Sequence, residues 1–183
     1  MSVLERLEQA LECAERIVTA GGAVTGLLIN ELWTGPHVGV VGAGSDGVAR
    51  VLERAGIPEV SWGHDAVTHG PMLCVEAGAC GPPSEMIRGA VRGLDAVGVS
   101  VVYVNWSWAR QGLSVSGTAA GDVSGPVGAA LGACLDVGPV YSSVYGQADG
   151  SSCFACRYRV GGGSTVDVRV EVVWRSSNVD NVT

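Results

Sequence analysis

The stretch Pro36–Gly56, PHVGVVGAGSDGVARVLERAG, decides the fold, because it predicts a strand, a tight turn and a helix in immediate succession. Its first part, Val38–Val41, is a β-branched run of the kind found in buried strands. Gly42–Gly44 then allows backbone angles that other residues avoid. Val48–Ala55 carries apolar residues at helical spacing with charged residues between them, and Gly56 predicts the end of that helix.

The segments on either side of this stretch predict further helices and paired strands. Ser2–Glu5 has the spacing of a capping box, so we expect a helix that continues to Gly21. Another helix is expected from Pro82 to Gly98. A third or fourth helix is expected from Pro126, and its inward residues are predicted to be Val127, Ala130, Leu131, Cys134 and Leu135. Strands are expected elsewhere, and the ranges that predict them are 59–63, 72–77, 99–108, 113–116, 140–145, 153–160 and 165–174, whereas 23–33 is ambiguous between strand and helix. Alternation along 99–108 predicts that one face of this strand carries Val102, Val104, Trp106 and Trp108.

The last of these strands alternates regularly, with valines and Trp174 on one side and charged residues on the other. This pattern is typical of an antiparallel sheet with one solvated face. We therefore predict one α+β domain over residues 1–183, with a polar tail at 175–183. Its sheet is expected to be mixed or mostly antiparallel, with three to four helices, a helix-strand-strand order and a C-terminal β-meander. An open α/β, Rossmann-like sheet is the second choice, because the C-terminal third offers no crossover helices.

Gly42, Gly44 and Gly47 match the pattern G-x-G-x-x-G after a predicted strand. The unit resembles the phosphate-binding turn of Rossmann dinucleotide-binding domains. That resemblance implies a nucleotide cofactor whose pyrophosphate is held by backbone N–H groups at the helix N-terminus, including Ser45. It also implies that Asp65, 23 residues after Gly42, binds the ribose.

The alternative is that these glycines only let the chain turn sharply. The chain has 28 glycines among 183 residues, about twice the usual share, so chance matches to this pattern are frequent. We favour this interpretation, and expect no cofactor.

Composition excludes several classes of function. The net charge of −7 argues against binding to a nucleic-acid backbone. All eleven basic residues are arginine, which excludes a P-loop lysine and a Schiff-base lysine. The sequence has no apolar run long enough to span a membrane, and Ser2–Val18 does not have the pattern of an export signal. We therefore expect a cytoplasmic or virion location.

Two groups of side chains are candidates for chemistry. His64, Asp65 and His69 lie in a polar segment and predict, as one alternative, an acid/base or metal site next to the glycine turn. Cys153 and Cys156 form a C-x-x-C within a predicted strand, where they would face opposite sides of the sheet. We therefore favour two structural thiols over a metal site, which stays a weak alternative.

Five tryptophans accompany a single phenylalanine. Tryptophan is enriched at protein interfaces, so we expect one or two of the five to lie at an interface. The candidates are Trp33, Trp62 and Trp108.

Two hypotheses of different classes follow. The first is a non-catalytic structural or assembly protein, either a homo-oligomer subunit or a component of a larger particle such as a virion. It rests on the low share of charged residues, 16%, and on the few catalytic side chains. The second is a small-molecule enzyme or nucleotide-binding module that uses Gly42–Gly47 with His64, Asp65 and His69. We favour the first.

Overall fold

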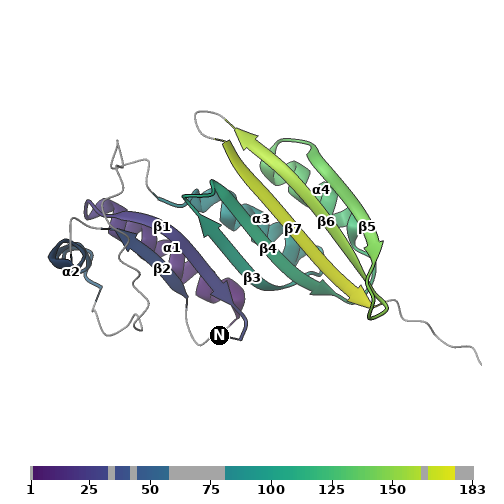
Figure 1. The fold of residues 1–183 in the computed structure, drawn as a ribbon, viewed down its shortest axis with the longest axis horizontal. Helices are drawn as coiled ribbons and strands as arrows, with labels where there is room; N and C mark the ends of the chain where they lie inside the picture. The colour runs from purple at the N-terminus through teal and green to yellow at the C-terminus, as the bar shows by residue number, and fades with distance from the viewer. Residues whose placement is uncertain (1, 33–35, 42–44, 58–80, 162–164, 176–183) are drawn as a thin grey trace, which may run out of the picture.

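The computed structural model describes residues 2–32, 36–41, 45–57, 81–161 and 165–175. In this part of the chain, four helices accompany one seven-stranded sheet (Figure 1), so the predicted α+β class is confirmed. The helices are α1 (Val3–Thr19), α2 (Ser45–Arg54), α3 (Ser84–Ala96) and α4 (Ser124–Leu135). The strands are β1 (Ala23–Asn30), β2 (His37–Val41), β3 (Ser100–Ser107), β4 (Gly112–Ala119), β5 (Pro139–Gly146), β6 (Ser151–Gly161) and β7 (Thr165–Arg175).

The sheet is mixed but mostly antiparallel, as the sequence predicts. Its strand order is β2-β1-β3-β4-β7-β6-β5. Every neighbouring pair is antiparallel except β4 and β7, which run parallel from Gly112↔Asp167 to Ala119↔Trp174. The predicted helix-strand-strand order and the final β5-β6-β7 meander are both present.

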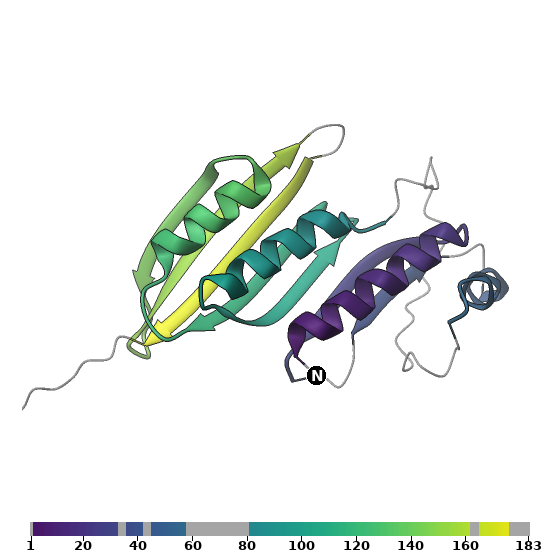
Figure 2. The ribbon, with the colours of Figure 1, turned by 180° about the vertical axis from the view of Figure 1, so that it is seen from behind.

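Helices α1, α3 and α4 all lie on one face of the sheet (Figure 2). The core lies between these layers and contains Leu7 and Leu11 of α1, Leu94 of α3 and Val104 of β3, each 0–1% exposed. No described helix lies on the opposite face, which we call the open face. Residues that alternate with the core residues of β6 and β7 therefore lie on the open face.

Local sequence accounts for the ends of the best-predicted elements. Ser2 and Glu5 form the predicted capping box at the start of α1: Glu5 N–H donates to Ser2 Oγ at 3.1 Å, and Ser2 N–H donates to Glu5 Oε2 at 2.7 Å. Gly21 and Gly98 follow α1 and α3 at φ +83° and +84°, where residues with a Cβ are strained.

Two details of the predicted core are wrong. The sequence places Val102 on the same face as Val104, but a register shift between Val101 and Tyr103 brings Val101 into the core instead. Cys134 of α4 is predicted to point inward but is exposed. Helix α4 is built almost entirely of small apolar residues, so its sequence has no polar side that would mark the solvated face.

Candidate functional site

The glycine turn that resembles a dinucleotide-binding unit lies partly outside the described residues. Gly42 and Gly44 belong to that part, whereas Ser45 and Gly47 lie in the first turn of α2. The strand before the turn, β2, pairs antiparallel with β1 and forms one edge of the sheet among the described strands. The predicted strands 59–63 and 72–77 lie outside the described residues. The resemblance implied an open parallel sheet, and the observed sheet differs from it. Nucleotide binding by these residues stays a prediction.

Of the other predicted acid/base and interface residues, the structure describes only Trp108. His64, Asp65, His69, Trp33 and Trp62 all lie outside the described residues. Trp108 follows β3. Its backbone N–H donates to the Thr25 carbonyl at 2.9 Å, and its side chain packs against the core. Its role at an interface stays a prediction.

Cys153 and Cys156 are both buried free thiols on β6. Cys156 belongs to the hydrophobic core, and burial raises the pKa of its thiol to about 11. Cys153 pairs with Val173 on the open face, and its hydrogen bond with Tyr145 raises the pKa of that phenol to about 12. The two sulfurs therefore lie on opposite faces, as predicted, and do not converge on a shared ligand. Among the described residues, no group of three or more His, Cys, Asp or Glu is placed to hold a metal ion.

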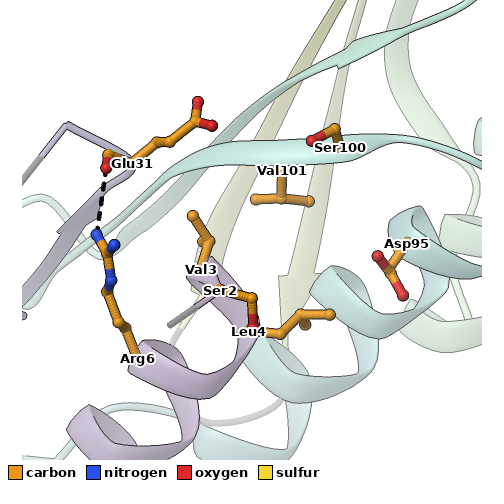
Figure 3. Close-up of a pocket in the computed structure, with 8 residues that line it drawn as sticks. All are labelled: Ser2, Val3, Leu4, Arg6, Glu31, Asp95, Ser100 and Val101. Carbon is orange, nitrogen blue, oxygen red and sulfur yellow. Dashed lines mark hydrogen bonds between the residues drawn. The ribbon is translucent and has the colours of Figure 1, made fainter.

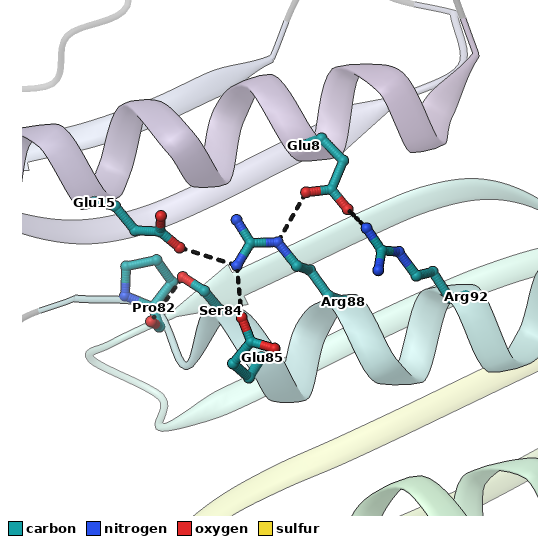
Figure 4. Close-up of polar contacts among 7 residues, drawn as sticks. All are labelled: Glu8, Glu15, Pro82, Ser84, Glu85, Arg88 and Arg92. Carbon is teal, nitrogen blue, oxygen red and sulfur yellow. Dashed lines mark hydrogen bonds and ion pairs between the residues drawn. The ribbon is translucent and has the colours of Figure 1, made fainter.

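The densest charged cluster of the described residues joins α1 to α3 (Figure 4). Arg88 Nε donates to Glu8 Oε2 at 2.8 Å. Arg88 Nη1 donates to Glu15 Oε1 and to Glu85 Oε1, each at 3.0 Å. Arg92 Nη2 donates to Glu8 Oε1 at 2.7 Å. Both oxygens of Glu8 are thus occupied. We interpret this cluster as a structural link between the two helices.

The electrostatics of Glu8 agree with that structural role. Partial burial raises the pKa of the Glu8 carboxyl, but the hydrogen bonds from Arg88 and Arg92 outweigh it, so the pKa lies below its usual value. Ionised Glu8 and protonated arginines therefore stabilise each other at neutral pH.

A hollow of about 300 Å³ lies beside the N-terminus of α1 (Figure 3). Arg6 and Glu31 line one side of it and Asp95 the other, with Val3 and Val101 between them. The Arg6 guanidinium donates to the carbonyl oxygens of Asn30 and Glu31 at 3.1 and 3.3 Å, so it holds the end of β1 against α1. We assign this hollow a structural role.

Strand β5 differs from the other strands in its exposure. Among the described strands it forms the second edge of the sheet (Figure 1), and its larger side chains are solvated. The exposed fractions are 60% for Val140, 54% for Tyr141, 49% for Val144 and 43% for Tyr145. Long apolar edge strands present free backbone groups to other chains, and natural proteins usually protect them with charge or by covering them.

Helix α4 flanks β5 across an open groove of about 510 Å³. The groove is lined by Gly125 and Gly128 of α4, by Ser142 and Val144 of β5, and by Phe154 of β6. Only one residue of Val123–Gly146 is charged, Asp136. We call the exposed residues of Val123–Gly146, together with this groove, the β5–α4 surface.

Sequence reasoning placed β5 correctly as a strand but missed the β5–α4 surface. The sequence PVYSSVYG has the composition of an ordinary half-buried strand. The one available signal is the near absence of charge over 24 residues in a chain that carries 29 charged residues in all.

None of the helices in the described residues combines the length and apolarity that a bilayer crossing requires. Comparison of the chain with models of known protein families, with curated proteins and with solved structures gives no match.

Proposed function

We propose that this protein is a non-catalytic assembly protein whose copies associate through the β5–α4 surface. The observation that carries the proposal is the uncharged and solvated edge strand β5. Four of the five exposed large hydrophobic residues in the described part of the chain lie on this one strand. Exposed apolar side chains concentrated on one edge strand are typical of interaction sites.

The two edges of the sheet differ in a way that supports the proposal. Strand β2, at the other edge, has five residues, and its Val38 and Val40 are buried. Strand β5 has eight residues and no charged side chain. Its protective features are Pro139 and a register shift between Pro139 and Tyr141, both at its first end. The remainder, Tyr141–Gly146, is suited to pair with another strand.

Charge favours a second copy of this chain as the occupant. Each copy carries a net charge of −7, so two copies repel each other through most of their surfaces. The β5–α4 surface, with Asp136 as its single charged residue, is where two copies can meet with little repulsion. An antiparallel pair of two β5 strands is also self-complementary, because such a pair of identical strands has a twofold axis.

A twofold axis perpendicular to the sheet would pair two β5 strands and join the sheets edge to edge. With the axis at Ser143, Tyr141 of each copy would lie opposite Tyr145 of the other, on the open face. Cross-strand aromatic pairs of this kind stabilise a sheet by about 0.2–1 kcal/mol each. Both α4 helices would lie on the same side of the joined sheet, and each groove would accept side chains of the facing strand. In a larger particle such as a virion, the same edge would join subunit to subunit.

The test is the mass of the protein in solution, measured by light scattering and native mass spectrometry over a range of concentrations. We expect the wild type to be a dimer or larger oligomer, and Val144→Lys to dissociate it, because a lysine on each copy would place like charges together. Leu32→Lys is the matched control, since Leu32 is 87% exposed but lies after β1, away from the β5–α4 surface. Circular dichroism checks that both variants stay folded. A wild type that is monomeric at every concentration would rule out self-association.

A further inference from the structure

The open face of β6 and β7 carries a concentration of positive charge in an acidic protein. These two strands contain four arginines and two acidic residues, whereas the whole chain has 11 basic and 18 acidic residues. The charged residues of both strands alternate with the core residues, which places them on the open face. The face is therefore opposite in sign to the protein as a whole.

Arg169 of β7 lies directly opposite Arg157 of β6 in the register of the sheet. The β-carbons of residues opposite one another across an antiparallel pair are about 4.5–5.5 Å apart, and like charges in such pairs are destabilising. For Arg157 this repulsion is outweighed by Asp167, whose hydrogen bond and charge raise the pKa of the guanidinium. Arg169 has no such partner among the described residues, so its charge is available to a ligand.

Nearby carboxylates compensate only part of this charge. Asp167 accepts hydrogen bonds from the guanidinium groups of both Arg157 and Arg159. The bond from Arg157, together with the nearby positive charge, holds the pKa of Asp167 below its usual value despite slight burial. Within the described residues, Arg169 has no ion pair or side-chain hydrogen bond, and Arg157 Nε is buried without a partner.

The strands on either side extend this pair into a polar row across the sheet. Ser114 of β4 lies opposite Arg169, and Asn105 of β3 lies opposite Ser114. On the other side, Tyr141 of β5 lies opposite Arg157. The row therefore presents two guanidinium groups between hydroxyl and amide groups. Arginine forms strong, often bidentate hydrogen bonds with carboxylates.

We propose that this row binds an acidic segment of a partner protein, with carboxylates of the partner placed between Arg169 and Arg157. Charge complementarity is the argument for this occupant. A long nucleic-acid strand would extend beyond the row and meet the charge of a protein with a net −7, whereas a short run of Asp or Glu would be confined to the row. Arginine and tyrosine are also enriched at protein interfaces. The inference does not depend on self-association through the β5–α4 surface.

The experiment measures binding of a fluorescein-labelled decaglutamate peptide by anisotropy at low ionic strength, with decaglutamine as the neutral control peptide. Arg169→Gln removes the arginine without breaking an ion pair to any described residue, and Arg50→Gln removes an equal charge from the exposed side of α2. A single-stranded oligonucleotide of matched length is the third probe. Thermal melts confirm that both variants are folded.

We expect decaglutamate but not decaglutamine to bind, and Arg169→Gln to weaken binding about tenfold, as the loss of one charge-assisted hydrogen bond implies. Arg50→Gln should change the affinity less than twofold. Three results would each overturn the proposal: no binding of decaglutamate to the wild type, equal losses in both variants, or binding of the oligonucleotide that is at least as tight and depends on Arg169.

Discussion

Gly89 of α3 and Cys134 of α4 approach so closely that no side chain fits between them: a Cβ at position 89 would lie 2.5 Å from Cys134 Sγ. Real β-carbons do not make contacts this short, so the pair fixes how closely the two helices pack. One turn further along α3, Gly93 faces Ala130, and a Cβ there would lie an ordinary 3.7 Å from the Ala130 Cβ. Two glycines of one helix therefore differ in the space that their neighbours leave.

This difference predicts opposite results for one substitution. Gly93→Ala should stabilise the protein by about 0.5–1 kcal/mol, the usual gain for alanine over glycine inside a helix. Gly89→Ala should gain nothing or lose about 1 kcal/mol, because Cys134 must move. The double variant Gly89→Ala with Cys134→Ala should recover the full gain. Urea denaturation of the single and double variants measures this coupling, and an equal gain at positions 89 and 93 with Cys134 present would contradict it.

The ion cluster between α1 and α3 predicts a pH-dependent stability. The pKa of Glu8 is lower in the folded protein than its usual value, so its contribution to stability is fully present above that usual value. It is lost as the pH falls through the lowered, folded-state pKa, where the carboxylate is protonated and its bonds to Arg88 and Arg92 weaken. We expect Glu8→Gln to lower the free energy of unfolding by about 1–2 kcal/mol at pH 7 and by much less near pH 3.

Glu12→Gln is the control for this measurement, because Glu12 lies on the same helix with an exposed side chain. Its effect should be within about 0.5 kcal/mol at both pH values, as for most surface substitutions. Chemical denaturation at pH 7 and pH 3 separates the two variants. A penalty for Glu8→Gln that is equal at both pH values would show that packing, and not charge, accounts for the effect.

Local sequence signals predicted much of the fold because they act within a few residues. The capping box of Ser2 and Glu5 positions the start of α1, and the alternation of Val168, Val170 and Val172 on β7 places the core face correctly. These patterns reflect helical and strand periodicity, which the sequence displays directly.

Features that depend on which strands become neighbours could not be predicted in the same way. The parallel pairing of β4 with β7 joins segments about 55 residues apart. The position of β5 at an edge follows from that pairing order, and so does the placement of Arg169 opposite Arg157. Alternation in the sequence puts each arginine on the open face, but only the register brings the two together. Both proposed binding surfaces therefore follow from the strand order and register, which the sequence does not show.

Replacement of glutamine by glycine should have opposite effects on stability at Gln111 and at Gln9. Gln111 lies in the turn between β3 and β4 with φ +44°, a left-handed conformation that strains residues with a Cβ. Its carbonyl accepts a hydrogen bond from Asp167 N–H at 2.8 Å, and its N–H donates to the Trp108 carbonyl at 3.0 Å. Both bonds involve only the backbone, so glycine would keep them.

We expect Gln111→Gly to stabilise the protein by about 0.5–1 kcal/mol, because relief of about 1–2 kcal/mol of left-handed strain exceeds the greater entropy loss of glycine on folding. Gln9→Gly, on the exposed side of α1, should instead destabilise it by about 0.5–1 kcal/mol, since glycine is a poor helix former. Thermal and urea unfolding of the two variants give the comparison. If Gln111→Gly destabilised the protein as much as Gln9→Gly, strain at the β3–β4 turn could not be the dominant contribution at that position.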